Sequence, residues 1–495
     1  MQRRAFIKAS AAAVSATSLS SMAFAGPEKR PNVVFLLTDQ WRAQATGYAG
    51  DPNARTPILD ALASQSANFT NAVSGLPLCC PARASLITGQ YPLKHSVFIN
   101  DVQLKPNTDT LGEAFQKAGY RTGYIGKWHL HGSPDGRYGR RNKYVPADQR
   151  FGFDYWKGNE VDHEYNHERY FTGDDPTPKF WPGYAPFAQT SDAIDFIDGA
   201  KADARPFFLM LSVGPPHFPW FTAPETYKDM FADADIQLRP NVPTSFAKRA
   251  VEGLKGYYAH AAALDDCVQR LLKALETSGL GEDTIFVFTS DHGEMMFSQG
   301  LEGKLYPWDE AIRVPLLIRY PRKLGSRGKR ITTPIGQPDV MPTLLGLADI
   351  PVPEGIQGID LSGVMVSGRS RGGPQSALLT NPVSTLQLRL HGMDSFRGVR
   401  TERHTYVRSI KGPWLLYDNE RDPYQKSNLI GTAAGKALIP EMEAELQMWL
   451  RRTGDAFLPG ATYLEQAGLS HYRETQSPIG TYHSPWGDWE STMGS

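Results

Sequence analysis

The feature that most constrains the fold is a series of short apolar runs with helical patterns between them. The runs are rich in β-branched or aromatic residues and read as buried strands: Asn32–Leu37, Gly119–Ile125, Pro206–Val213 and Thr284–Thr289. Helical patterns cover 56–69, with Thr56 as cap and Pro57 in the first turn, then 110–119, and about 246–275. This alternation predicts an α/β fold, a mostly parallel sheet sandwiched by helices.

Composition excludes several classes of function. The 52 Lys and Arg residues balance the 52 Asp and Glu residues, so no net field recruits nucleic acid or an anionic membrane surface. No window past the N-terminus reaches about 18 uncharged apolar residues, so stable membrane insertion is not expected. With 3 cysteines, the chain is expected to gain its stability from packing rather than from disulfides.

The N-terminus has the pattern of a cleavable export signal. A basic start with Arg3 and Arg4 precedes a weakly apolar run and an A-x-A pattern that ends at Ala25. The paired arginines indicate the bacterial twin-arginine route, which exports folded proteins. We expect residues 1–25 to be a signal peptide and the mature protein to be periplasmic or secreted.

Polar residues that can carry chemistry follow each predicted strand. In open α/β sheets, ligands bind outside the carboxyl ends of the strands. Any one of these residues could be a helix cap, a surface charge or a turn residue, but their recurrence at one edge predicts a functional site. They are Asp39, Gln40, Lys127, His129, His217, Asp291 and His292.

The donor types at this edge suggest a divalent cation. Asp39, Asp291 and the amide oxygen of Gln40 are hard oxygen ligands, and His292 adds one nitrogen. Such a set suits Ca²⁺, with Mg²⁺ as the alternative, better than zinc. Cationic groups are expected around the metal, which implies a substrate with an oxyanion such as phosphate or sulfate; they are Arg83, Lys127, His129, His217 and Lys304.

Cys79 and Cys80 are adjacent and cannot easily form a disulfide with each other. Free cysteines are most often small core residues. The surrounding residues nevertheless resemble the C-x-P-[SA]-R-x-x-L-x-T-G signature of the type I sulfatases, in the alkaline phosphatase superfamily: Cys79, Pro81, Arg83, Leu86, Thr88 and Gly89. Starting the motif at Cys80 would put Ala82 where proline is required. Ala82 itself stands where the family most often has serine.

The resemblance extends over most of the chain, in segments that occur in the family's order: VVFLLTDQ, TGYIGKWHL, GPPHFPW, FTSDHGE, EAIRVPLLIRYP, DVMPTLLGLA and LLYDNERDPYQKSNL. It implies an alkaline-phosphatase-like catalytic domain over residues 26–375. It also implies a smaller C-terminal α+β subdomain, an antiparallel sheet with a helix, over 376–495.

The resemblance also implies a mechanism. Cys79 would be oxidised to Cα-formylglycine by a maturation enzyme and would join the metal ligands, with Cys80 as a packed neighbour. One hydroxyl of the hydrated aldehyde would attack sulfur while Asp291 takes its proton. Arg83 would hold the diol, and Lys127 and Lys304 would offset charge on the sulfuryl oxygens. His217 would protonate the leaving alcohol, and His129 would deprotonate the second hydroxyl to expel sulfate.

Substrate size depends on loops rather than on the motifs. Segments 137–144, 161–171, 179–187 and 471–489 are dense in Arg, His, Tyr and Trp. With Tyr165, His167 and Trp181 as candidate contacts, they predict subsites for a sulfated polysaccharide or glycosaminoglycan, although ordinary surface loops are an alternative.

Two other functions remain open. One is a phosphodiester or phosphonate hydrolase that uses the same formylglycine, and the other is a catalytically silent binder of sulfated glycans. A two-zinc phosphatase is disfavoured because no second cluster of His and Asp follows the strands.

Overall fold

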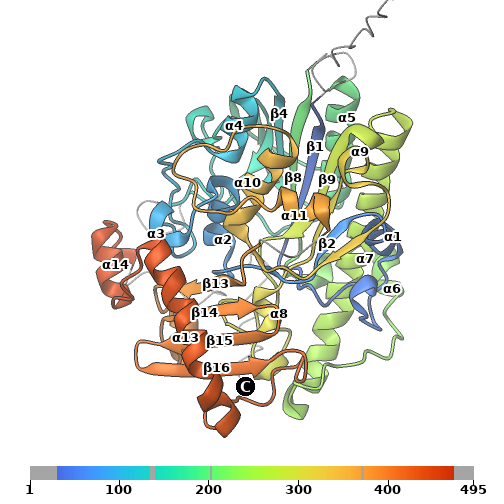
Figure 1. The fold of residues 1–495 in the computed structure, drawn as a ribbon. Coiled ribbons are helices and arrows are strands. Elements are labelled where there is room, and N and C mark those ends of the chain that lie inside the picture. Colours follow the sequence, from blue (N-terminus) through green and yellow to red (C-terminus); the bar gives the residue numbers. More distant parts are fainter. Residues whose placement is uncertain (1–29, 134–139, 201–202, 204, 369–372, 473–495) are drawn as a thin grey trace, which may run out of the picture.

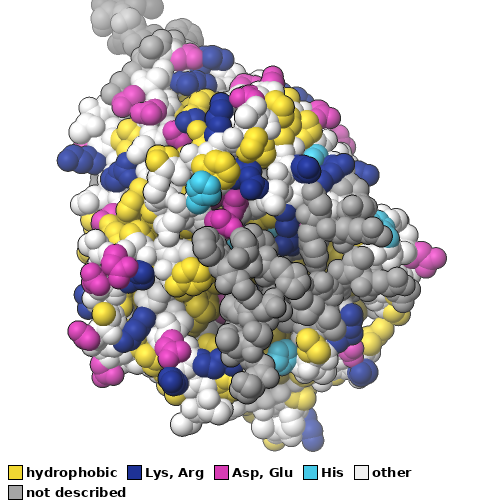
Figure 2. Space-filling view, turned by 180° about the vertical axis from the view of Figure 1, so that it is seen from behind, with side chains coloured by type: hydrophobic (Ala, Val, Ile, Leu, Met, Phe, Trp, Pro, Cys, Tyr) yellow, Lys and Arg dark blue, Asp and Glu magenta, His cyan; other side chains and the backbone are white. Residues whose placement is uncertain are grey.

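The computed structural model describes residues 30–133, 140–200, 203, 205–368 and 373–472. The predicted signal peptide, residues 1–25, lies outside this part of the chain, so it stays a prediction. None of the helices in the described part has the length and hydropathy of a transmembrane span. Positive and negative side chains are intermixed on the face drawn in Figure 2, in keeping with the balanced charge of the chain.

The large sheet has ten strands within the described residues (Figure 1). In spatial order they are β11 (Lys329–Ile331), β2 (Ala67–Phe69), β10 (Leu316–Arg319), β9 (Thr284–Ser290), β1 (Asn32–Asp39), β8 (Phe207–Pro216), β4 (Arg121–Lys127), β5 (Tyr155–Asn159), β6 (Arg169–Thr172) and β7 (Asp175–Phe180). The central run from β9 to β5 is parallel, and antiparallel pairs flank it on both sides. The predicted mostly parallel sheet is confirmed.

Helices cover both faces of this sheet (Figure 1). The helices of the whole described chain, some of which lie away from this sheet, are α1 (Pro57–Ala63), α2 (Cys79–Thr88), α3 (Pro92–His95), α4 (Leu111–Lys117), α5 (Ala185–Ala200), α6 (Glu225–Asp229), α7 (Ala247–Thr277), α8 (Asp309–Ile312), α9 (Pro321–Leu324), α10 (Gln337–Leu347), α11 (Ser362–Ser367), α12 (Leu386–Leu390), α13 (Ala433–Thr453) and α14 (Gly460–Gln466). Short 3₁₀ turns lie at Gly47–Ala49, Ala147–Gln149, Trp220–Thr222, Thr244–Phe246, Gly281–Asp283 and Ser298–Gly300.

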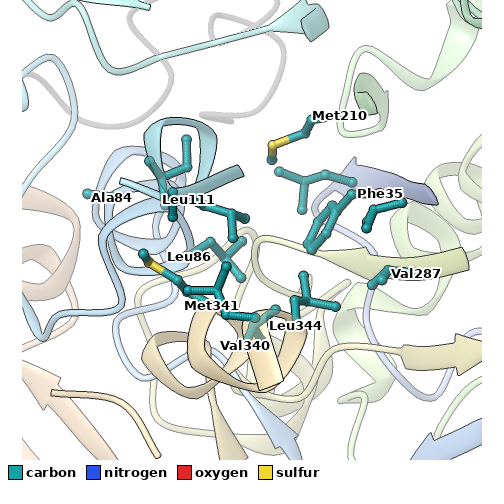
Figure 3. Close-up of a cluster of buried hydrophobic side chains, with 14 of the residues drawn as sticks. Phe35, Ala84, Leu86, Leu111, Met210, Val287, Val340, Met341 and Leu344 are labelled. Carbon is teal, nitrogen blue, oxygen red and sulfur yellow. The ribbon is translucent and has the colours of Figure 1, made fainter. Parts of the chain in front are cut away.

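Strand β1 shows why the sheet is buried on both sides. Successive side chains of a strand point to opposite faces. Val33, Phe35 and Leu37 pack with residues of α2, α4 and α10, a cluster of which Figure 3 shows part. Val34 and Leu36 pack on the other face with residues of α1, α5 and α7. Because both faces are apolar, the strand reads as a continuous hydrophobic run rather than an alternating one.

The predicted helix over 56–69 is wrong in its second half. Helix α1 ends at Ala63, and Ala67–Phe69 forms β2, whose backbone pairs with β10 and β11. Thr56 is the N-cap residue and Pro57 lies in the first turn, as predicted, but the Thr56 side chain makes no capping hydrogen bond. Buried Asp265 of α7 accepts hydrogen bonds from the amides of Ile58 and Leu59 instead, at 2.9 and 2.8 Å. Both differences arise from partners distant in sequence.

A second, smaller sheet lies at one end of the large one (Figure 1). It is an antiparallel meander of β13 (Ser376–Asn381), β14 (Phe396–Thr401), β15 (His404–Ser409) and β16 (Gly412–Asp418), and α13 packs on it through Met442, Leu446 and Trp449. The predicted α+β region is thus confirmed, while its boundary at residue 376 stays a prediction. A further short pair joins β3 (Ala72–Val73) to β12 (Ile335–Gly336).

Candidate active site

The carboxyl ends of the central strands bring the predicted site residues to one edge. Asp39 is the last residue of β1, and Asp291 directly follows the neighbouring β9. The two strand ends are tied together, because the Gln40 amide donates to Asp291 Oδ1 at 3.0 Å and the Asp291 amide donates to the Thr38 carbonyl at 3.2 Å. Lys127 ends β4. The parallel register therefore converts distant sequence positions into one constellation.

Helix α2 delivers Cys79 to this edge from its first turn. All ten residues of α2 are buried, the helix packs beside α10, and Gly89 ends it at φ 61°. The Cys79 Sγ lies 3.3 Å from His292 Nε2, 3.4 Å from Lys304 Nζ and 4.0 Å from Asp39 Oδ1. Ligand atoms of Asp39, Cys79, Asp291 and His292 all lie within 4.8 Å of one another.

This cluster fits a divalent cation by the chemistry of its donors. Two carboxylates, one imidazole and the Cys79 sulfur converge here, all from fully or almost fully buried side chains. Oxygen-rich sets with one nitrogen suit hard cations. Among the described residues, no other group of three or more His, Cys, Asp or Glu has this geometry.

Arg83 and Lys127 bind the two carboxylates from the inner side. Arg83 donates to Asp291 Oδ2 at 3.0 Å through Nε and to Asp39 Oδ2 at 3.2 Å through Nη2. Its Nη1 donates to the Lys127 carbonyl at 2.9 Å and to Ser212 Oγ at 2.8 Å. Lys127 Nζ also binds Asp39 Oδ2, at 2.5 Å. The guanidinium therefore orients both carboxylates and makes four hydrogen bonds from its five N–H donors.

Gln40 lies beside the cluster in a strained backbone conformation, with φ 68°. Its amide oxygen accepts from Lys304 Nζ at 2.6 Å, and its amide nitrogen donates to buried Glu294. In this arrangement the oxygen predicted to bind the metal is bound to Lys304. Such strain is found where surrounding contacts fix a residue at a functional site.

Burial and charge shift the pKa values of the site groups. Burial and Asp39 oppose ionisation of Cys79, but Lys127, Lys304 and His292 bring the pKa of the thiol well below its usual range. Burial likewise opposes ionisation of Asp39, yet Lys127 and His217 hold its pKa low. For Asp291, burial and the adjacent Asp39 charge raise the pKa. At this edge of the sheet, the protonation states of the site residues therefore depend strongly on the charges of neighbouring side chains.

His217 and His129 are both buried beside the cluster. Burial and then Lys304 lower the pKa of His217 well below its usual value. His129 Nε2 lies 3.6 Å from Asp101 Oδ1. Burial opposes protonation of His129, but Cys80 and Asp101 prevail and raise its pKa well above the usual value.

Cys80 lies away from the carboxylates. Its sulfur accepts a hydrogen bond from the Asp101 amide at 3.3 Å, and it packs in the core cluster of α2, α4 and α10. Two consecutive residues at the start of a helix point in directions about 100° apart, so adjacent thiols have different surroundings.

Two of the three residues predicted to contact a glycan, Tyr165 and Trp181, are buried, which does not favour direct contact with a polymer. Tyr165 is fully buried and donates to the Phe218 carbonyl at 3.3 Å. Trp181 is 3 % exposed and donates to Asp192 Oδ2 at 2.8 Å. Only His167 of the three is exposed, and it stacks on Phe180. Residues 137–139 and 473–489 of the predicted loops lie outside the described chain.

Sequence reasoning gave no individual role to three residues at the site. His163 stacks on His217 and lies 3.5 Å from Lys127 Nζ. Glu294 binds the Gln40 side chain, and Gln337 of α10 donates to the Asp291 carbonyl. Glu294 follows β9 closely enough to be found from sequence, whereas His163 and Gln337 have no strand-end position that marks them.

Comparison with known proteins agrees with this geometry. A family model described as Sulfatase matches residues 31–350, and one described as N-sulphoglucosamine sulphohydrolase, C-terminal, matches 298–452. An ulvan-active sulfatase of Formosa agariphila is 44% identical over 88% of this chain and 84% of its own length. An endo-4-O-sulfatase of Bacteroides thetaiotaomicron is 29% identical over 86% of this chain and 93% of its own.

A solved structure of a putative sulfatase from Bacteroides fragilis has the same fold, with a TM-score of 0.78 and 30% identity over 89% of this chain and 99% of that one. The fold and its strand-end site thus define a hydrolase of the alkaline phosphatase superfamily. Within it, the chain belongs to the sulfatase family and is a sulfuric ester hydrolase.

Proposed function

We propose that the protein removes O-sulfate from sulfated carbohydrates, using formylglycine made from Cys79 by a maturation enzyme and a bound Ca²⁺ or Mg²⁺. The observation that carries this proposal is the buried cluster of Asp39, Cys79, Asp291 and His292, flanked by Lys127 and Lys304. Arg83, Lys127 and Lys304 face two carboxylates there. Three cationic side chains beside a metal ion suit an anionic substrate such as a sulfate ester.

We assign the metal site to Asp39, Asp291 and His292, with Gln40 and residue 79 completing it. When bound, the cation supplies charge that stabilises negative charge developing on the sulfuryl oxygens and on the attacking hydroxyl. An aldehyde at position 79 supplies, once hydrated, a hydroxyl that can attack sulfur. We assign to Asp291 the acceptance of the proton of that hydroxyl, because its carboxylate lies in the same cluster as residue 79.

The remaining residues bind the sulfate group and move protons. Arg83 holds Asp39 and Asp291 in place through Nε and Nη2, and its predicted hold on the diol stays part of the proposal. Lys127 and Lys304 bind the sulfuryl oxygens, where each preorganised donor is worth about 2.7–4 kcal/mol. We assign to His129 the removal of the proton from the second hydroxyl, after which sulfate leaves. This role requires the neutral imidazole, which the raised pKa of His129 opposes.

His217 protonates the departing alcohol. Its Nδ1 donates to the Phe218 carbonyl at 2.7 Å, so Nε2 is the atom that exchanges the proton. The lowered pKa of His217 arises from burial and from Lys304. A bound sulfate ester brings negative charge beside both groups and favours the protonated imidazole.

A sulfated polysaccharide is supported by the relatives rather than by the described loops. The 44%-identical relative is an ulvan-active sulfatase, and another relative is an endo-4-O-sulfatase. Export to the periplasm or beyond, as the N-terminus predicts, would place the enzyme where such polymers occur.

A matched panel of esters tests the proposal. Sulfated oligosaccharides, 4-nitrophenyl sulfate and the corresponding phosphate diester and phosphonate monoester are compared by kcat/KM. We expect the highest value on a sulfated oligosaccharide. A preference for the phosphorus esters would support the phosphonate hydrolase instead, and binding of sulfated glycan without turnover, with Cys79 unmodified, would support the silent binder.

A further inference from the structure

Two histidine rings lie face to face beside the candidate site, and only one of them has a role so far. His163, in the connection between β5 and β6, stacks on His217 with ring centroids 4.3 Å apart and planes 20° apart. Phe218 packs on the second ring, with its centroid 4.1 Å from that of His217. His217 is 2 % exposed and His163 is half-buried. The His163 and Phe218 centroids are 6.1 Å apart, so the three rings form one compact aromatic group in which His217 contacts both neighbours.

Hydrogen bonds fix the direction in which each ring points. The Phe218 carbonyl can only accept, so the 2.7 Å contact requires a proton on His217 Nδ1 and turns Nε2 away from the loop. His163 Nε2 lies 3.5 Å from Lys127 Nζ, and because an ammonium group can only donate, this nitrogen is the acceptor. The same Nζ donates to Asp39 Oδ2 at 2.5 Å.

His163 thus contacts two groups of different function at once. One face of its ring meets the residue that protonates the leaving oxygen, and its edge meets the ammonium that binds the sulfuryl oxygens. The bond that breaks in a sulfate ester joins sulfur to the leaving oxygen, and the same sulfur carries the sulfuryl oxygens that Lys127 binds. A group that fixes the separation of His217 and Lys127 therefore fixes the geometry around the scissile bond.

We propose that His163 is a positioning residue, which aligns His217 by stacking and Lys127 by accepting its hydrogen bond. This inference rests on the proposed sulfatase mechanism. The two contacts of His163 affect different parts of the reaction, namely protonation of the leaving group and binding of the sulfuryl oxygens. Stacking matters only when the leaving group needs a proton, whereas the Lys127 contact matters for every sulfate ester. A misplacement of about 1 Å in such a group can cost about 10²-fold in rate.

Two substitutions separate the contacts. His163→Phe keeps an aromatic ring for stacking and removes the acceptor. His163→Gln places an amide oxygen near the position of Nε2 and removes the ring. Both are compared with the wild-type holoenzyme on a sulfated oligosaccharide, a poor leaving group, and on 4-nitrophenyl sulfate, a good one. The ratio of the two kcat/KM values on one preparation does not depend on the fraction of enzyme that is folded.

For His163→Phe we expect kcat/KM to fall about tenfold on both substrates, with their ratio within about twofold of wild type. For His163→Gln we expect kcat on the oligosaccharide to fall about 10–100-fold with little change in KM, and the aryl sulfate to stay within about threefold. Equal losses on both substrates for His163→Gln, or wild-type rates for both variants, would overturn the inference. A wild-type enzyme that releases sulfate from neither ester would instead refute the proposed function.

Discussion

The strand-end edge and the small C-terminal sheet both bury charged side chains, but they use them differently. In the small sheet, Arg400 of β14 binds both oxygens of Asp309 at 3.0 and 3.2 Å, and Arg397 binds Asp455. Each carboxylate is closed in by guanidinium groups and neighbouring polar atoms. At the edge, Arg83, Lys127 and Lys304 surround Asp39 and Asp291, and a thiol and an imidazole meet the same carboxylates.

The difference separates stability from chemistry. A closed buried pair is costly to break but has no charge left to offer a ligand. A buried cluster with mutually perturbed pKa values is a poor way to stabilise a fold and is typical of catalytic sites. Substitutions at the edge should therefore remove activity with modest effects on folding, and substitutions in the small sheet should do the reverse.

The largest expected effect is on turnover. Cys79→Ala should abolish sulfate release, by at least about 10⁴-fold, because the nucleophile is lost. Its thermal unfolding temperature should change little, since one small side chain at a helix start is altered. Cys80→Ala is the matched control and should keep most activity. The reverse pattern would show that Cys80 starts the motif.

Metal removal comes next. A chelator should abolish activity, and Ca²⁺ or Mg²⁺ should restore it. The chelator should also lower the thermal unfolding temperature of the wild type, because an ion that binds only the folded state stabilises that state. Asp291→Asn should lose this temperature difference between metal and chelator. A variant that kept the full difference would place the ion elsewhere.

His217→Ala should have an effect that depends on the substrate. We expect kcat/KM on a sulfated oligosaccharide to fall about 10²–10⁴-fold, the usual contribution of a general acid. The loss on 4-nitrophenyl sulfate should be much smaller, because nitrophenolate leaves without a proton. Equal losses on the two substrates would remove His217 from the acid role.

In the small sheet the expected effect is on stability. Arg400→Ala should lower the free energy of unfolding by about 3 kcal/mol, because it leaves Asp309 buried without its bidentate partner. Lys411→Ala, which breaks an exposed pair with Asp394 in the same region, should cost less than about 1 kcal/mol. Urea unfolding measures both, and kcat of the folded enzyme should not change. A large loss of kcat for Arg400→Ala would contradict the assignment of the small sheet to stability rather than to catalysis.

The smallest effect concerns the pH dependence of stability. Glu168 is fully buried, accepts from Asn159 and Gln189 through Oε1, and burial raises its pKa from 4.5 to about 8. The folded state then holds a proton that the unfolded chain releases, so stability falls as pH rises from about 4.5 to 8. Glu168→Gln stays neutral, and its unfolding temperature relative to wild type should rise by a few degrees over that range. A constant difference would show that Glu168 is ionised in the fold.

The parts of the site that sequence could predict are those carried by regular elements. Buried strands have a clear apolar pattern, and parallel pairing brings the residues after them to one edge, so Asp39, Lys127 and Asp291 could be placed together. The features that sequence did not predict depend on contacts between residues distant in sequence. Pairing with β10 and β11 turned the end of a helical pattern into a strand, and Asp265 accepts the capping hydrogen bonds expected of the Thr56 side chain.

The connections between strands were the least predictable. A loop dense in aromatic residues suggested side chains available to a substrate. Tyr165 and Trp181 instead pack their rings in the interior, and their polar atoms hydrogen-bond to the Phe218 carbonyl and to Asp192. His163 sits in that loop, and no local pattern links it to His217. Only the folded arrangement of β5 and β8 relative to β4 brings the two rings into contact.

The central claim is that residue 79 becomes the nucleophile by oxidation. Peptide mass spectrometry of enzyme that is actively releasing sulfate tests it most directly. The account predicts that the peptide with Cys79 has exchanged its thiol for an aldehyde, losing sulfur and two hydrogens and gaining one oxygen, while Cys80 remains a thiol. Fully active enzyme in which Cys79 is unmodified, or in which Cys80 carries the aldehyde, would contradict it.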